Sequence, residues 1–174
     1  MNRFIIGIGV ACLLVIAIWL TPSMLDKHEV KYDGAPLEIG VVGDIPEIKN
    51  EKIHLETLSF EALSDNSKKV SENFNAIMIT PKAFEEASND KFINVYEGLD
   101  IPIVFFDSAK THKPFVHQGL TYDSAYEYLK NGSHTTVYRY DAKINKEDAW
   151  YFYLENQKEV DALYTEIFKK IEQL

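Results

Sequence analysis

Residues 37–42 read Leu-Glu-Ile-Gly-Val-Val, a short apolar run rich in β-branched side chains. Two later runs have the same character, Ala76–Ile79 (AIMI) and Ile101–Phe106 (IPIVFF). Strands that are apolar on both sides belong inside a sheet that is covered on both faces. The three runs therefore predict the buried centre of one sheet.

Helical segments are predicted between these strands. Thr80-Pro81 favours a helix start, because Thr can cap a helix whose first position is Pro. Residues 59–71 are also expected to be helical, with a break at Ser64–Ser67, whereas Lys52–Leu58 alternates as a strand with one solvated face. Helical connections between buried strands imply right-handed crossovers and a parallel sheet.

The second half of the chain contains aromatic strands in place of the continuous apolar runs of the first half. Two aromatic strands, Thr135–Tyr140 and Trp150–Leu154, are separated by the polar stretch 141–148 and are expected to pair antiparallel at the sheet edge. Thr121 is expected to cap a helix that Asn131-Gly132 stops. A final helix is predicted from Asn156, with Glu159 as its capping partner; its buried side is Val160, Leu163, Tyr164, Ile167 and Ile171.

The predicted fold is a three-layer α/β sandwich. Its sheet is mainly parallel, in the manner of flavodoxin-like or Rossmann-like folds, with antiparallel edge strands. We assign residues 37–174 to this domain and residues 26–36 to a linker, because 26–36 contain Asp33-Gly34 and Pro36 and show no periodic pattern.

Residues 1–25 have the composition of a membrane segment. Phe4–Leu20 contains 17 residues without a charge, just enough to cross a bilayer as one transmembrane helix. No Ala-x-Ala follows it, which favours an uncleaved signal anchor over a cleaved signal sequence, although Thr21-Pro22-Ser23 leaves cleavage open. The short amino-terminal tail without acids favours tail inside and domain outside, so we expect a single-pass membrane protein with an extracytoplasmic domain.

The single cysteine, Cys12, lies within this apolar run. Lipidation at Cys12 is the alternative to a buried small hydrophobe, but the chain after it stays apolar, which favours burial. Because the domain itself has no cysteine, it can form no disulfide and no thiolate site.

The charge argues against nucleic acids as partners. Lys and Arg number 18 and Asp and Glu 27, for a net charge of −9. Nucleic-acid binding depends on clustered basic side chains that release counterions from phosphates. The basic residues are almost all Lys, which favours an AT-rich bacterial genome.

Acidic and hydroxyl side chains follow the three buried strands: Asp44 the first, Thr80 the second, and Asp107 with Ser108 the third. Ligands of open parallel sheets bind beyond the carboxyl ends of the strands. Asp44 and Asp107 could hold a divalent cation or polarise a water there, although turns and helix caps use the same residues.

His112 and His117 lie in a segment expected to be a loop. Their spacing of five matches no compact metal motif, and no HExxH, GxSxG or glycine-rich phosphate loop occurs. Solvated loop histidines are therefore favoured over zinc ligands. We keep both histidines, together with Asp44, Asp107 and Ser108, as catalytic candidates, and predict neither a metal nor another cofactor.

Tyrosines are concentrated in the last third of the chain. On alternating strands Tyr138 and Tyr140 share one face, as do Tyr151 and Tyr153. An exposed tyrosine patch offers large contact area with polar tips, which suits a protein or small-molecule partner. We name these four tyrosines and Thr80 as the candidate binding residues.

Three functions follow from these observations. The favoured one is a membrane-anchored extracytoplasmic binding module without catalysis. The alternatives are a metal-dependent hydrolase built on Asp44 and Asp107, and a structural component of a cell-envelope assembly.

Overall fold

The computed structural model of the protein describes residues 31–126, 134–154, 156 and 159–174. Its centre is a six-stranded sheet in the order β2-β1-β3-β4-β5-β6. The first four strands pair in parallel, and β5 and β6 are antiparallel. The strands are β1 (Leu37–Val42), β2 (Ile53–Thr57), β3 (Ala76–Ile79), β4 (Ile103–Ser108), β5 (His134–Asp141) and β6 (Lys146–Tyr153). The predicted α/β class is confirmed, as is the antiparallel pair at one edge.

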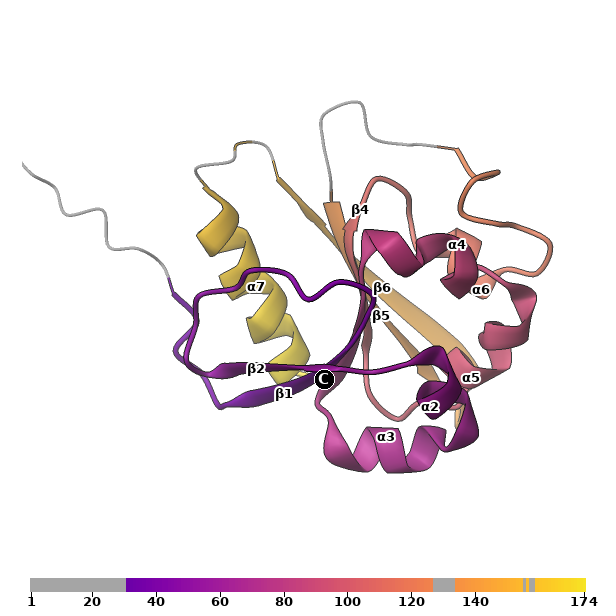
Figure 1. The fold of residues 1–174 in the computed structure, drawn as a ribbon, viewed down its shortest axis with the longest axis horizontal. Helices are drawn as coiled ribbons and strands as arrows, with labels where there is room; N and C mark the ends of the chain where they lie inside the picture. The colour runs from indigo at the N-terminus through magenta and orange to yellow at the C-terminus, as the bar shows by residue number, and fades with distance from the viewer. Residues whose placement is uncertain (1–30, 127–133, 155, 157–158) are drawn as a thin grey trace, which may run out of the picture.

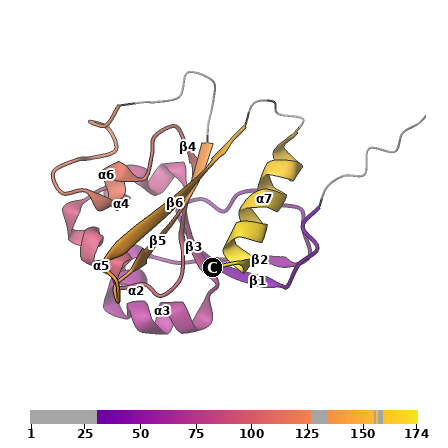
Figure 2. The ribbon, with the colours of Figure 1, turned by 180° about the vertical axis from the view of Figure 1, so that it is seen from behind.

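Helices cover both faces of this sheet (Figure 1). One face carries the short helices α2 (Phe60–Asp65), α3 (Ser67–Asn73), α4 (Phe84–Ala87), α5 (Ile93–Glu97) and α6 (Lys113–Val116), with 3-10 turns at Pro81–Ala83 and Asp90–Phe92. The other face carries the longer helix α7 (Val160–Glu172). Figure 2, seen from behind, shows β5 and β6 running between α7 and the short helices.

Strand alternation divides the apolar side chains between two cores. Ile77, Ile79 and Phe105 face the short helices, whereas Met78 and Val104 face α7. Because neighbouring residues of a strand point to opposite faces, continuous apolar runs are what a sheet buried on both sides requires.

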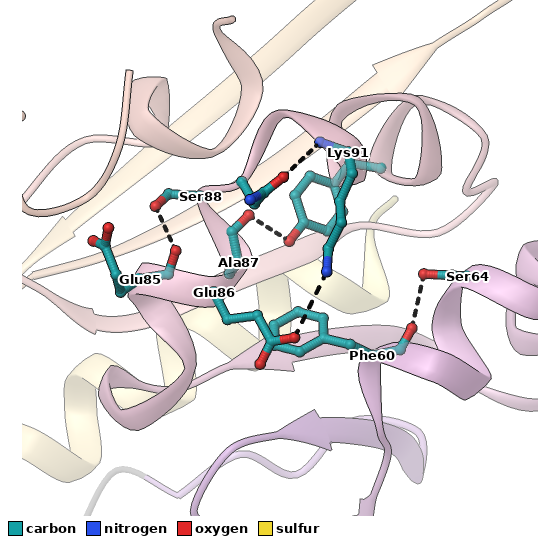
Figure 3. A network of polar contacts seen from close by, with 9 residues as sticks. Phe60, Ser64, Glu85, Glu86, Ala87, Ser88 and Lys91 are labelled. Atoms are coloured by element: carbon teal, nitrogen blue, oxygen red, sulfur yellow. Dashed lines mark hydrogen bonds and ion pairs between the residues drawn. The ribbon is translucent and has the colours of Figure 1, made fainter. Parts of the chain in front are cut away.

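Hydrogen bonds fasten the turns around α4, as Figure 3 shows. The Ser88 hydroxyl donates to the Glu85 carbonyl at 2.8 Å, and Lys91 forms an ion pair with Glu86 at 3.9 Å. The Ser88 hydroxyl also accepts from the backbone N–H of Tyr122 at 2.8 Å. The segment that follows α6 is thus held against α4.

The packed structure reaches back into the segment expected to be a linker. Tyr32 is 3% exposed and packs edge-on against Phe168 of α7, with ring centroids 5.8 Å apart. Its hydroxyl donates to the Ala35 carbonyl at 2.7 Å, and the Ala35 N–H donates to Glu172 at 2.8 Å. Residues 32–35 are therefore attached to α7.

Two element predictions need correction, and a third falls partly outside the described residues. Helix α7 begins at Val160, and its N-cap Glu159 makes no side-chain capping bond; the Glu159 N–H donates to the Asn156 carbonyl. Residues 157 and 158 lie outside the described residues, so the helix start at Asn156 stays a prediction. Residues 121–126 form a turn rather than the start of a helix, and the rest of that predicted helix lies outside the described residues. The second edge strand starts at Lys146, four residues before its predicted start, because the hairpin turn is shorter than the polar stretch.

The membrane segment predicted within residues 1–25, including Cys12, lies outside the described residues. In the part of the chain that the structure describes, no helix has both the length and the apolar character needed to cross a bilayer.

Candidate metal centre

The carboxyl ends of β1 and β3 lie side by side, as predicted, but their polar residues are already engaged. Asp44 pairs with Lys82 at 2.9 Å on the exposed surface. Thr80 is buried, and its hydroxyl donates to the Val42 carbonyl at 3.4 Å. Gly43 has φ of +107°, and a Cβ there would lie 2.3 Å from Thr80 Oγ1, so glycine is required for this close approach.

The end of β4 places Asp107 and Ser108 in different surroundings. Ser108 is fully buried and its hydroxyl donates to the Lys110 carbonyl at 2.7 Å, which makes it a structural residue of the loop. Asp107 is exposed. Strand β3 separates β1 from β4, so Asp44 and Asp107 follow strands roughly 10 Å apart. The described residues show no contact that joins the two carboxylates.

His112 and His117 bracket the single turn of α6, at its N-cap and C-cap. Pro114 at the start of the turn favours this local conformation. Phe115 attaches α6 to the sheet, because its ring stacks on Phe105 of β4 at 4.0 Å between centroids. Although the two histidines are five residues apart, one ring nitrogen of each lies within 4.8 Å of the other.

The expectation of two solvated loop histidines is wrong for His112, which is 5% exposed; His117 is exposed. The His112 ring stacks on Tyr138 of β5, with centroids 5.4 Å apart. Its Nδ1 lies 2.8 Å from the hydroxyl of Tyr151 of β6. The remaining nitrogen, Nε2, lies 4.0 Å from a carboxylate oxygen of Glu147.

The β5–β6 hairpin positions these partners. Tyr138 is opposite Ala149, and Tyr140 is opposite Glu147. Residues two apart on a strand share a face, so Glu147 and Tyr151 lie on the same face as Tyr138. The Tyr138 hydroxyl donates to Glu147 Oε2 at 3.5 Å.

The tyrosines do not form the single exposed patch that was expected. Tyr138 is 1% exposed and belongs to the core that faces the short helices, whereas Tyr153 is 55% exposed. Tyr140 is half-buried, and its hydroxyl donates to Asn145 at 2.6 Å. Tyr138 and Tyr151 instead surround His112.

Burial shifts the pKa values of His112 and of the two tyrosines beside it. It lowers the pKa of His112, and this effect outweighs the opposing attraction of Glu147, while the nearby His117 lowers the pKa further. Burial also raises the pKa of Tyr138 and of Tyr151, and the charge of Glu147 adds to both shifts. At neutral pH the site therefore presents a neutral His112 imidazole and two protonated phenols.

His112, His117 and Glu147 each offer one ligand atom, and these atoms lie within 4.8 Å of one another. A tetrahedral zinc ion needs donor atoms about 3.3 Å apart. Metal binding would require these atoms to move closer together, and two of the side chains, His117 and Glu147, are exposed at the surface. The three groups match the nitrogen and oxygen ligands of a zinc-type ion.

Glu147 is the residue that the sequence analysis missed. It lies in the stretch expected to be a loop, and its place beside His112 depends on the register of the hairpin. Glu147 shares a strand face with Ala149 and Tyr151, but residues 146–148 are all charged, so the sequence does not reveal this face until the strand start is known.

The chain matches no protein-family model, no curated protein and no solved structure. The class of this site therefore rests on its own geometry.

Proposed function

We propose that this protein is a metal-binding module whose domain lies outside the cytoplasmic membrane, and that it binds one divalent transition-metal ion through His112, His117 and Glu147. The observation that carries the proposal is the convergence of these three ligand atoms within 4.8 Å, from α6 and from β6. In this proposal, the metal ion is the ligand of the binding module that the sequence predicts.

The chemistry of the ligands favours zinc or a similar ion. Imidazole nitrogen suits zinc, copper and nickel, whereas calcium and magnesium prefer sites made entirely of oxygen. Metal ligation requires a neutral histidine, and the lowered pKa of His112 keeps its ring in that form. With a metal at Nε2, the proton stays on Nδ1 and is donated to the Tyr151 hydroxyl oxygen, which fixes the orientation of the ring.

The location and the finer fold class belong to the same proposal. The uncharged run Phe4–Leu20 supports a transmembrane anchor. The strand order 2-1-3-4 of the parallel part is the order found in flavodoxin-like sheets, which supports that architecture for the domain. Protease added to intact cells should remove the domain, and a domain that stays intact until the cells are lysed would contradict this orientation.

A metal titration tests the proposed function. The full chain, purified in detergent and stripped of metal with a chelator, is titrated with zinc in competition with a coloured chelator. We expect one zinc ion per chain, and little binding of calcium or magnesium at the same concentrations. His117→Ala and Glu147→Gln should each weaken zinc binding at least about tenfold, since each removes one of three ligands.

His54→Ala and Glu166→Gln are the matched controls, because both residues are exposed and lie on other elements, β2 and α7. Circular dichroism establishes that each variant folds. Wild-type protein that binds no zinc in a one-to-one complex, or ligand variants that bind like the two controls, would refute the proposal.

A further inference from the structure

A cavity lies between the end of β4 and the start of α7, away from the proposed metal centre. Its volume is about 160 Å³. Its apolar walls come from the end of β4, from the residue that follows β6 and from α7, and they are Phe106, Leu154, Val160, Leu163 and Tyr164. The Phe106 and Tyr164 rings lie 5.4 Å apart between centroids. The cavity thus offers an apolar interior with two aromatic side chains.

Two polar residues complete this cavity, Asp107 and Thr135. The backbone N–H of Asp107 donates to the Thr135 hydroxyl at 3.2 Å. Asp107 has φ of +58°, a left-handed conformation that aspartate adopts more often than most residues. The register of β4 against β5 shifts between Phe105 and Ser108, and this irregularity holds Asp107 at the rim.

Among the residues that the structure describes, no basic side chain forms an ion pair with the Asp107 carboxylate. Lys110 lies close in sequence, but its ammonium group donates to the carbonyl oxygens of Tyr122 and Asp123. The other charged group that acts on Tyr164 is Asp161, which is also acidic.

We propose that this cavity binds a small organic cation, a primary alkylammonium whose chain occupies the apolar interior and whose ammonium group pairs with the Asp107 carboxylate. An anion would meet Asp107 without a compensating positive group. A neutral alcohol would fill the interior but could not form an ion pair with the Asp107 carboxylate. Aromatic rings such as those of Phe106 and Tyr164 also favour a cation over a neutral group.

The volume limits the size of this ligand. A water molecule occupies about 30 Å³ in the liquid, so the cavity holds roughly five non-hydrogen atoms. A chain of about four carbons fits, and a ligand of this size binds weakly, with a dissociation constant on the order of a millimolar or higher. This inference uses none of the proposed metal ligands and stands or falls independently of them.

The test uses n-butylammonium, n-butanol and butyrate as probes of similar length with positive, neutral and negative ends. Binding to the full chain is measured by saturation-transfer NMR. We expect n-butylammonium to bind at least about threefold more tightly than n-butanol, and butyrate to show no binding. Asp107→Asn should weaken n-butylammonium binding about tenfold, and Val160→Phe, which narrows the cavity while keeping the carboxylate, should weaken all binding.

Asp161→Asn is the matched control, because it removes a neighbouring acid that does not line the cavity. Equal weakening by Asp107→Asn and Asp161→Asn would show attraction to the acidic surface only and would overturn the proposal. So would equal binding of n-butylammonium and butyrate. Thermal unfolding of each variant establishes that the domain is folded.

Discussion

At the level of single residues, Tyr151 is the group that organises the proposed metal centre without being one of its ligands. Its hydroxyl lies 2.8 Å from Nδ1 of His112, which leaves Nε2 on the side of Glu147. Partners of this kind fix the tautomer and the ring orientation of a metal-binding histidine. Tyr151 is therefore a positioning residue.

Replacing Tyr151 with Phe removes this hydroxyl and keeps the ring. We expect zinc affinity to fall about tenfold, because His112 loses the partner that holds its Nδ1 proton. Tyr140→Phe is the control, since the Tyr140 hydroxyl donates to Asn145 in the hairpin turn. Competition titration of both variants checks the expectation, and equal affinities would remove Tyr151 from the site.

Sequence patterns identified most members of this cluster but not their association. His112 and His117 stood out as histidines, and Tyr138 and Tyr151 as strand tyrosines. Histidine spacing alone did not predict a metal site, because the third ligand comes from a strand about thirty residues further along. Proximity of this kind arises from tertiary packing, which no local spacing encodes.

At the level of elements, the long apolar runs were the most predictable part of the chain. β1 and β3 have the predicted boundaries, and β4 begins two residues after its predicted start, because runs buried on both faces leave little choice of conformation. The β5–β6 hairpin was less predictable, because Lys146–Asp148 carry charges and still pair with β5. An edge strand accepts polar residues that a central strand excludes.

Helix α7 and residues 32–35 form a second unit whose stability should depend on pH. Burial and the charge of Glu172 raise the pKa of Tyr32 to about 12. The unfolded chain loses this proton near pH 10, where the folded protein still keeps it. Stability from this group is therefore complete below pH 10 and is lost as the pH rises from about 10 to about 12.

Tyr32→Phe should reduce this loss. Between pH 9 and pH 12 we expect the free energy of unfolding of the variant to fall by roughly 1 kcal/mol less than that of the wild type. This value is smaller than the full pKa shift would give, because solvent screens part of the interaction. Tyr126→Phe is the control, because Tyr126 is 83% exposed. Urea unfolding across this pH range measures the difference, and parallel curves for wild type and Tyr32→Phe would contradict the assignment.

At the level of the whole molecule, the proposed ion would join parts of the chain that the fold already brings together. Its ligands come from the turn of α6 and from the edge strand β6, on the sheet face that carries the short helices. The predicted sheet centre supplied the framework, whereas the site lies at the antiparallel edge rather than at the carboxyl ends of the parallel strands. The fold class could therefore be predicted from local apolar runs, whereas the candidate site depended on the tertiary packing of distant residues.

Anomalous X-ray diffraction at the zinc absorption edge, from crystals of the protein grown with one equivalent of zinc, tests the central claim most directly. The account predicts one peak about 2.0–2.2 Å from His112 Nε2, from a His117 nitrogen and from a Glu147 oxygen. Zinc found only at other positions, with these three side chains unliganded, would contradict it.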